Sequence, residues 1–512
     1  MERDIVLLSP PTSSNRTPEE NLGLEYLASE SRLNGHKVDY IDGYLAKINV
    51  DEVVERICQK NPEIIGISPS MDSFENVLEI VKNLRQQGYG GQIILGGIYA
   101  SFEADSLLLA TEGAINGVLT GEADDTFQTY LQNGIEGTPG GVYKIGQEIR
   151  KNPNEIVCED LDRLPSPIRE SLQLVRSNKT PSHVMGSRGC YGNCSFCSVA
   201  CFQKFSSDKR WRGRSPLSIV NELNELSDNG ETMVKFIDDN FFGGKDKSRE
   251  MEIARLMKEK NINMRFRLSL RVNDVTDEVI SEMKSAGLFA VSLGIESFVQ
   301  RKLNDYGKGT TVEQNIKALD ILKKYGIYVQ MGHIMFDPYM TVSEVEQELF
   351  YLGQAQWGVT KGICTQLFAA EGTEITERIR KDFGFVGKEG TNNIYEIQDE
   401  KVRNFRNALR TWSKNNTVIY DMAIDPISAP KNVSAEAHEA FHKVCMDLRR
   451  MDLEVSKEIL EKCKTGTKQE VDILAENLIN NNRDRLNKIK NAVDNLYEKY
   501  GLEYNATINK RI

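Results

Sequence analysis

The sequence predicts an α/β protein made of a doubly wound parallel sheet, a partial barrel of six β/α units and a C-terminal helical region. Short β-branched runs alternate with helix-like apolar spacing in residues 1–145, and this alternation starts again near residue 183. From about residue 395 the pattern becomes helical and highly charged. Strands that alternate with helices are typical of parallel sheets. A chain of 512 residues is also long enough for several cores.

The first predicted domain, 1–145, contains five candidate strands, at 5–8, 38–41, 64–67, 93–95 and 117–120. Doubly wound sheets bind ligands at the carboxyl edge, where the strand order reverses. We therefore expect ligand-binding residues in the loops that follow these strands. The candidates are Ser68, Ser70, Gly96, Gly97, Gly121 and Glu122.

The second predicted domain, 183–394, follows a connector at 146–182 whose segment 159–167 is polar and contains proline. Its candidate strands lie at 184–187, 233–237, 265–269, 290–294, 329–335 and 363–367, with helical segments between them. Barrel enzymes gather their chemistry at the carboxyl ends of the strands. We therefore expect the functional residues of this domain just after each strand.

Three cysteines with C-x3-C-x2-C spacing, Cys190, Cys194 and Cys197, follow the first of these strands. Three thiolates can hold three irons of a [4Fe–4S] cube and leave the fourth iron for an external ligand. With Cys201 the same run could instead close a zinc tetrahedron. Structural zinc sites usually take ligand pairs from two separated knuckles, and no second C-x2-C pair appears downstream, so the spacing favours the cluster.

The run 188–197 resembles the signature of the radical S-adenosylmethionine (radical SAM) enzymes. The resemblance implies that the amino and carboxylate groups of SAM bind the open iron. It also implies that one electron from the cluster splits SAM to give a 5′-deoxyadenosyl radical. Phe196 occupies the position at which the family carries an aromatic residue beside the adenine.

Further residues after the predicted barrel strands match this family. Asp238 and Asp239 lie where its members bind the methionine amino group, and the sequence does not distinguish between the two. Arg271 is a candidate partner of the SAM carboxylate, because guanidinium groups bind carboxylates with two hydrogen bonds. Glu296, in a Gly-Ile-Glu-Ser segment, is placed to accept hydrogen bonds from the ribose or the amine. Taken alone, the two aspartates would also suit a turn, Arg271 a surface salt bridge, and Glu296 a solvated or salt-bridged carboxylate.

The loops of the first domain, with segments 23–28 and 35–38, resemble the cobalamin-binding Rossmann domain of class B radical SAM methylases. The resemblance implies a bound cobalamin near the loop residues named above. The Asp-x-His-x-x-Gly motif that supplies a lower cobalt ligand is missing, because His36 is the only histidine before His183. We therefore expect no protein imidazole on cobalt. The alternative is a domain that keeps the fold without the cofactor.

Composition restricts the partners. The net charge is −11, from 64 basic and 75 acidic residues, and no dense basic block suggests nucleic-acid binding. No apolar stretch approaches the ~20 residues of a membrane span. Nine cysteines, four of them close together, do not resemble a secreted disulfide framework, so a cytoplasmic location is expected. The family resemblance also implies an external one-electron donor such as flavodoxin or ferredoxin.

These observations predict a cobalamin-dependent radical SAM methyltransferase that acts on an unactivated carbon, or on phosphorus, of a small-molecule or peptide substrate. The alternative is a non-methylating radical SAM enzyme of similar layout, such as a dehydratase, cyclase or oxidoreductase. Methylthiotransferases need three further cysteines in the first domain, whereas only Cys58 and Cys158 precede the barrel. A cobalamin- or metal-binding regulatory protein is the non-enzymatic alternative. The region 395–512 offers no chemistry of its own.

Overall fold

The computed structural model describes residues 2–12, 17–154, 158–205, 210–389, 391–428 and 431–504. The chain forms two compact units. The first consists of Met1–Ser14, Pro18–Cys190 and Ser198–Ser218, and the second of Asn15–Thr17, Tyr191–Cys197 and Ile219–Ile512. The second unit thus holds most of the predicted barrel together with the helical region. The four-part division of the sequence stays a prediction.

A seven-stranded sheet in the order β2-β1-β3-β4-β5-β6-β7 forms the centre of the first unit. Strands β1 to β5 pair in parallel, whereas β6 and β7 add an antiparallel edge. The bounds are β1 Asp4–Ser9, β2 Lys37–Asp42, β3 Ile64–Ile67, β4 Gln92–Leu95, β5 Gly117–Leu119, β6 Gly141–Ile145 and β7 Glu148–Lys151. The five predicted strands are therefore confirmed, and β7 lies inside the predicted connector.

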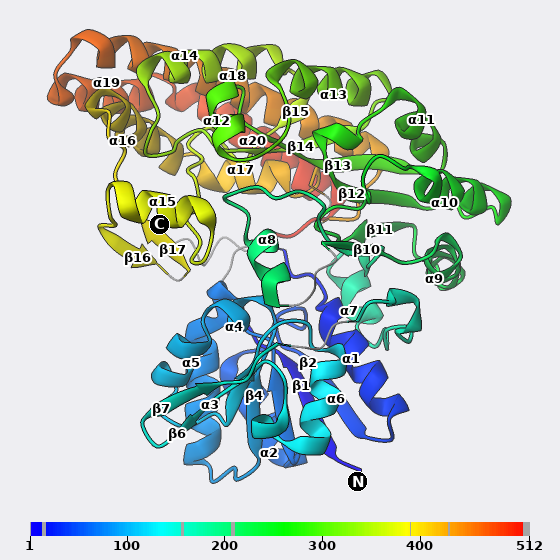
Figure 1. Ribbon diagram of the computed structural model, residues 1–512. Helices are drawn as coiled ribbons and strands as arrows, with labels where there is room; N and C mark the ends of the chain where they lie inside the picture. The colour runs from blue at the N-terminus through cyan, green and yellow to red at the C-terminus, as the bar shows by residue number, and fades with distance from the viewer. Residues whose placement is uncertain are drawn as a thin grey trace. The chain divides into compact units, whose positions relative to one another are not determined.

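Helices cover both faces of this sheet, and Figure 1 shows them on either side of it. Their bounds are α1 Leu22–Leu33, α2 Val50–Lys60, α3 Phe74–Gln86, α4 Ile98–Phe102, α5 Ala104–Ala110 and α6 Asp124–Asn133. One apolar core packs α2, α3, α4 and α5 against the sheet, and a second packs α1 and α6 against it. Burial on both faces explains why β1 and β3 read as continuous apolar runs rather than alternating ones.

The rest of the first unit surrounds the start of the cysteine motif. It contains α7 Leu172–Ser177, β8 Ser182–Val184, β9 Ser187–Gly189, α8 Ser198–Phe202 and β10 Trp211–Gly213. Strands β9 and β10 pair antiparallel on the two sides of the motif. Arg214 follows β10 and donates to the carbonyl of Met185 and to the hydroxyl of Tyr26, at 2.8 and 3.2 Å.

A parallel sheet in the order β15-β14-β13-β12-β11 forms the centre of the second unit. The bounds are β11 Met233–Phe236, β12 Arg265–Arg271, β13 Leu288–Glu296, β14 Tyr328–His333 and β15 Gly358–Val359. The expected fold class, an N-terminal doubly wound domain followed by a parallel-sheet domain and helices, is confirmed. The prediction of a strand at 363–367 is wrong. The strand that pairs with β14 is β15, which ends at Val359, and within 363–367 only Gln366 forms an isolated bridge, with Phe336.

The helices of the second unit lie before, between and after these strands. Helix α9 Pro216–Asp228, which begins in the first unit, precedes β11. Between the strands lie α10 Ser248–Glu259, α11 Asp277–Ser285, α12 Gln300–Asp305, α13 Val312–Lys324 and α14 Val342–Gln354. After them come α15 Glu374–Asp382, the hairpin β16 Gly387–Glu389 and β17 Asn392–Ile394, and α16 Glu400–Lys414, α17 Thr417–Ile424, α18 Ala435–Thr465, α19 Lys468–Asn481 and α20 Arg483–Tyr500. Within the described ranges, no helix combines the length and apolar character that a membrane crossing needs.

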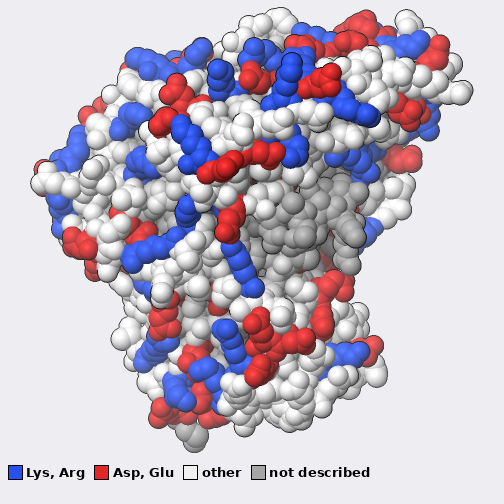
Figure 2. All heavy atoms as spheres, turned by 180° about the vertical axis from the view of Figure 1, so that it is seen from behind, with Lys and Arg blue, Asp and Glu red and all other residues white. Residues whose placement is uncertain are grey.

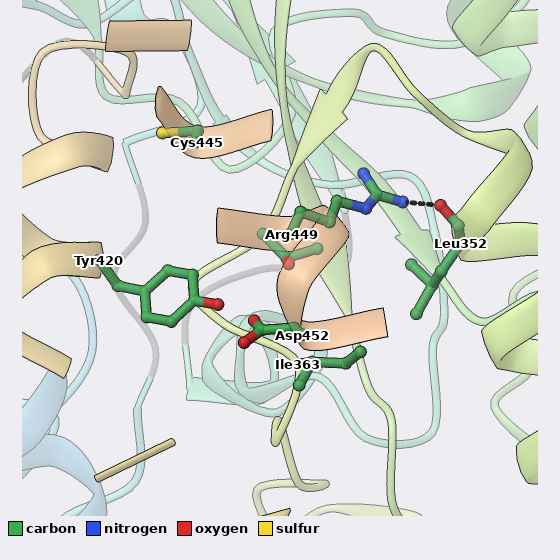
Figure 3. A pocket seen from close by; sticks show the side chains of 7 residues that line it. Leu352, Ile363, Tyr420, Cys445, Arg449 and Asp452 are labelled. Atoms are coloured by element: carbon green, nitrogen blue, oxygen red, sulfur yellow. Dashed lines mark hydrogen bonds between the residues drawn. The ribbon is translucent and has the colours of Figure 1, made fainter. Parts of the chain in front are cut away.

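Buried polar side chains of α18 join the helical region to the barrel. Arg449 donates to the carbonyls of Leu352 at the end of α14 and of Gly358 in β15, and Figure 3 shows the bond to Leu352. Burial lowers the pKa of Arg449 to about 10. One turn further on, Asp452 accepts a hydrogen bond from Trp412 Nε1 at 2.7 Å, and burial raises the pKa of Asp452 to about 7. The two carbonyl acceptors thus hold the buried charge of Arg449, while the carboxyl group of Asp452 can stay neutral.

Candidate active site

The cysteine loop of the second unit, residues 191–197, is pinned to the barrel by Ser195. The Ser195 amide donates to the carbonyl of Tyr306 at 2.9 Å, and its hydroxyl donates to the carbonyl of Asp305 at the same distance. The Ser195 carbonyl accepts from the amide of Ile375 at 3.0 Å. Because Tyr306 follows α12 and Ile375 begins α15, two separate elements fix the loop that carries Cys194 and Cys197.

Arg271, the last residue of β12, packs directly on this loop. Its Nη1 donates to the Sγ of Cys194 at 3.2 Å, and its guanidinium carbon lies 5.3 Å from the centre of the Tyr191 ring. A Cβ at Gly192 would overlap the same guanidinium nitrogen. Gly192 therefore leaves room for the close approach of Arg271, which would have to move if this residue carried a side chain.

The hydrogen bonds continue from Arg271 to Glu296. Nη2 of Arg271 donates to the carbonyl of Lys308, and Lys308 Nζ donates to Glu296 Oε1 at 2.9 Å. The Lys308 side chain is 4% exposed and that of Glu296 is 13% exposed, so this ion pair is largely shielded from solvent. Lys308 thus contacts both residues, Arg271 through its main-chain carbonyl and Glu296 through its Nζ.

Glu296 has an unusual backbone at the end of β13. Its φ is +64°, in the left-handed region, and the pairing of β13 with β14 shifts register between Gly294 and Glu296. A Cβ at Gly294 would lie 2.8 Å from Glu296 Oε1, and one at Gly332 would lie 3.3 Å from Oε2. The two glycines therefore leave room for the carboxylate. Non-glycine residues in this conformation are strained and cluster at functional sites.

The structure distinguishes the two aspartates that follow β11. Asp238 is buried, with 4% exposure, whereas Asp239 is exposed. The next residue, Asn240, is fully buried; its Oδ1 accepts from the backbone amide of Arg271 at 3.1 Å and its Nδ2 donates to Asp274 at 3.3 Å. Sequence reasoning missed Asn240 as the residue that fixes the end of β12, although it stands directly beside the aspartate pair.

Phe196 lies in an apolar cluster rather than in solvent. Its ring meets that of Tyr306 edge-on, with 5.3 Å between the ring centres. The buried members of this cluster are Tyr306, Ile334, Leu367, Ala369, Ile375, Ile379 and Tyr395. The aromatic residue between the last two motif cysteines thus stands against the segments that follow β14 and β15.

His333, the last residue of β14, and Tyr339, which follows this strand, are engaged within the protein. The His333 ring, 1% exposed, contacts Glu348 at 3.0 Å, and Glu348 also lies 3.3 Å from Lys302 Nζ. Although burial alone would raise it, the neighbouring Lys302 and His333 lower the pKa of Glu348 to about 2. The Tyr339 hydroxyl donates to Asp382 at 2.7 Å. Both side chains are therefore held by carboxylates of the same unit.

In the first unit, three of the predicted loop residues lie next to one another at the carboxyl edge of the sheet. Gly97 has a φ of +92°, and a Cβ there would lie 3.0 Å from the hydroxyl of Ser68. Ser101 connects two loops, because its hydroxyl donates to the carbonyl of Gly97 at 2.8 Å and accepts from the amide of Gly121 at 3.0 Å. The structure thus brings together Ser68, Gly97 and Gly121.

Two further loop residues have local backbone roles. Gly96 continues the β-ladder, since its amide donates to the carbonyl of Ile67 at 3.0 Å. The amide of Ser70 donates to the hydroxyl of Ser73 at 2.8 Å and helps to begin α3. These residues shape the edge of the sheet through main-chain geometry.

Glu122, in contrast, is held by arginines of β9 and β10. Its carboxylate accepts from Arg188 at 2.9 Å and from Arg212 at 3.1 Å. Asp124 accepts two further bonds from Arg188, at 2.5 and 3.0 Å. Burial raises the pKa of Asp124, but the Arg188 guanidinium outweighs it and holds the value below its ordinary range. These arginines fix the loop after β5, and Arg188 stands two residues before Cys190.

The donor set fits an iron–sulfur cluster. Cys190, Cys194 and Cys197 are thiols outside disulfides, and Cys194 is buried against Arg271. A cation beside a sulfur stabilises negative charge on it, which iron ligation needs. In the part of the chain that the structure describes, no three His, Cys, Asp or Glu side chains converge as they would on a single metal ion. A cube does not require such convergence, because each thiolate binds a different iron.

Comparison with known proteins agrees with this geometry. Residues 184–352 match the model of the radical SAM superfamily, and residues 13–131 match that of the B12 binding domain. An uncharacterized methyltransferase of Pyrococcus horikoshii is 31% identical over 359 residues, which are 67% of this chain and 76% of that protein. The anaerobic magnesium-protoporphyrin IX monomethyl ester cyclase of Rubrivivax gelatinosus is 27% identical over 341 residues, 60% of this chain and 58% of the cyclase.

A solved structure has the same fold along nearly the whole chain. The cobalamin-dependent S-adenosylmethionine radical enzyme OxsB, with aqua-cobalamin and S-adenosylmethionine bound, gives a TM-score of 0.78 at 17% identity. The match covers 98% of this chain and 84% of OxsB.

The fold and the site define a radical SAM enzyme with a preceding B12-binding domain. The chain belongs to the cobalamin-binding radical SAM family. Its cofactors are accordingly a [4Fe–4S] cluster, S-adenosylmethionine and cobalamin.

Proposed function

We propose that this enzyme is a cobalamin-dependent radical SAM methyltransferase that methylates an unactivated carbon, or phosphorus, of a biosynthetic substrate. The observation that carries the proposal is the set of hydrogen bonds that joins Cys194 to Arg271, Arg271 to Lys308 and Lys308 to Glu296. It brings together a candidate cluster ligand and a strained acidic residue at the carboxyl edge of the barrel sheet. The similarity to a methyltransferase supports methyl transfer as the outcome.

The cofactors supply a one-electron cleavage of SAM and a methyl carrier. Cys190, Cys194 and Cys197 would hold the cluster, and Arg271 would fix the orientation of Cys194. Glu296 would accept hydrogen bonds from a ribose hydroxyl or an ammonium group, with Lys308 holding its carboxylate in place. Buried Asp238 is better placed than exposed Asp239 for an ammonium group in a water-poor site.

For cobalamin, the candidate residues are those of the carboxyl-edge loops. Ser68, Gly97 and Gly121 would contact the cofactor, while Gly96 and Ser70 would shape the backbone around it. Glu122 would act through its arginine pairs, because Arg188 and Arg212 already bind its carboxylate. Because the segment between the first strand and the first helix contains no histidine, the protein would supply no imidazole ligand to cobalt there.

A non-methylating radical reaction is the second candidate. The similarity to the Rubrivivax gelatinosus cyclase supports it. Both candidates use the same cysteine loop and the same SAM residues, and they differ in whether a methyl group reaches the product.

The proposal includes partners and location. An external one-electron donor would reduce the cluster, and the substrate would be a small molecule or a peptide. Figure 2 shows basic and acidic side chains intermixed over the face in view, an arrangement that offers no continuous basic track to nucleic acid. A reducing cytoplasm would suit the thiols and an oxygen-sensitive cluster.

Anaerobic reconstitution with SAM, a reductant and methylcobalamin tests the proposal. We expect the protein to retain cobalamin through gel filtration and to produce 5′-deoxyadenosine. The Cys194→Ala variant is expected to lose 5′-deoxyadenosine formation while still retaining cobalamin. Formation of 5′-deoxyadenosine without cobalamin retention or without a methylated product would favour the second candidate instead.

A further inference from the structure

A pocket of about 350 Å³ opens where the segment after β15 meets α16. Its walls come from residues 364–368, from the hairpin of β16 and β17, and from one face of α16, which Figure 1 labels. Segment 364–368 runs beside Phe336, because the Phe336 amide donates to Thr365 and the Leu367 amide donates to Phe336, at 3.0 and 2.8 Å. Phe336 lies three residues beyond β14, so the pocket stands at the carboxyl edge of the barrel sheet, where barrel enzymes bind substrates.

Three cations of α16 line this pocket. Arg406, Arg410 and Lys414 are spaced four residues apart and therefore share one face of the helix. The opposite face is buried through Val402, Phe405, Ala408, Leu409 and Trp412. Like charges at this spacing destabilise a helix, so the row is costly unless an anion offsets it.

None of the three cations has a counter-ion among the residues that the structure describes. Their side chains form no salt bridge or hydrogen bond there, and the Nε of half-buried Arg406 is buried without any partner. Elsewhere in this unit, Arg380 binds Glu371 at 2.7 Å and Lys464 binds Glu346. Burial and the charge of Arg410 both lower the pKa of Arg406. A half-buried guanidinium whose buried Nε has no acceptor costs free energy that a bound anion would recover.

The other lining groups complete a site for an anionic head group. The pocket contains one carboxylate, from exposed Glu389, against the three cations. Polar neutral side chains are contributed by Gln366, Asn392, Tyr395, Ser413 and Thr417. Leu367 and Tyr395 also belong to the apolar cluster that holds Phe196, so the pocket shares a wall with the packing around the cysteine loop.

We propose that this pocket binds an oxyanion, a phosphate or carboxylate group, of the substrate, with Arg406 and Arg410 as its principal donors. Guanidinium groups bind both kinds of oxyanion with paired hydrogen bonds. That the anion belongs to the substrate rests on the proposed function above. The pocket itself rests on the unpaired arginines.

Calorimetry on the anaerobically purified full-length protein, with its cofactors bound and at constant ionic strength, tests the proposal. The probes are inorganic phosphate and acetate. We expect at least one of them to bind, and we expect Arg410→Gln to weaken that binding about tenfold or more, the usual effect of losing a charged hydrogen bond. Binding of phosphate alone indicates a phosphate ester, and binding of acetate alone indicates a carboxylate. Binding of both probes indicates a site for oxyanions that accepts phosphate as well as carboxylate groups.

The matched control is Arg56→Gln, which removes an exposed arginine of α2 that has no partner in the described structure. It should bind the anion as the wild type does. Arg406→Lys keeps the charge and checks that any loss in Arg406→Gln reflects lost donors rather than misfolding. Absence of binding by both probes, or binding that persists in both Arg406→Gln and Arg410→Gln, overturns the proposal. Because calorimetry needs no turnover, a protein that binds the anion without cleaving SAM would refute the proposed function and leave the pocket standing.

Discussion

The Nη1 of Arg271 lies 3.2 Å from the Sγ of Cys194. A cation bonded to a cluster ligand stabilises the reduced, more negative cluster, because hydrogen bonds to the sulfurs and net charge set such potentials. We therefore predict that Arg271→Gln lowers the midpoint potential of the cluster. Loss of one charge-assisted hydrogen bond corresponds to a shift of about 60 mV for one electron.

A redox titration followed by electron paramagnetic resonance measures this shift, with iron content determined in parallel. Arg255→Gln is the control, because among the described residues this exposed arginine of α10 pairs only with glutamates of its own helix. An unchanged potential in Arg271→Gln at full iron content would show that this hydrogen bond does not survive cluster assembly.

The buried pair of Lys302 and Glu348 predicts a large effect on stability. Both side chains are 0% exposed and lie 3.3 Å apart. Glu348→Gln leaves a buried ammonium without a counter-charge, which typically costs about 3–5 kcal/mol. The exposed pair of Lys324 and Asp277 is the comparison, and Asp277→Asn should cost much less than Glu348→Gln because solvent screens the exposed pair. Urea unfolding of the two variants measures both costs, and equal losses would contradict the prediction.

Asp452 predicts a pH dependence of stability. Burial raises its pKa from 3.8 to about 7, so between these values the unfolded chain releases a proton that the folded protein retains. This group therefore makes the folded state less stable as pH rises from about 4 to about 7. Asp452→Asn keeps an acceptor for Trp412 and should flatten the dependence in that window. Unfolding measurements at pH 5, 6 and 7 test this prediction, and Asp447→Asn, which alters a half-exposed aspartate of the same helix, is the control. Parallel curves of stability against pH for the wild type and Asp452→Asn would refute the prediction.

The position of Glu296 predicts that replacing this residue lowers the affinity of the protein for SAM. Replacing its carboxylate by an amide in Glu296→Gln removes a charged acceptor and should weaken SAM binding by about tenfold or more. Equilibrium binding of SAM to the reconstituted protein measures this change. Glu313→Gln, which alters an exposed glutamate of α13, should bind as the wild type does. Unchanged affinity in Glu296→Gln would remove Glu296 from the SAM site.

The sequence predicts the parallel strands and the cysteine motif well because both signals are local. Apolar runs such as 64–67 and the spacing of three cysteines need no knowledge of distant residues. The contacts of Asn240 with Arg271 and of Lys308 with Glu296 could not be found in this way, because they join residues 31 and 12 positions apart and depend on the directions of side chains.

Two other features show the same limit. The apolar segment 363–367 resembles a strand, but its backbone makes only an isolated bridge to Phe336. The spacing of Arg406, Arg410 and Lys414 is visible in the sequence. Only the structure shows that a pocket faces them and that no described carboxylate neutralises them.

The most direct test of the radical mechanism is a count of iron and zinc in the anaerobically prepared protein, together with the electron paramagnetic resonance spectrum of its reduced form with and without SAM. We predict four irons per chain and a spectrum that changes on SAM addition, with both lost in Cys194→Ala. A chain that holds zinc in place of iron, or a cluster whose spectrum ignores SAM, would contradict the mechanism.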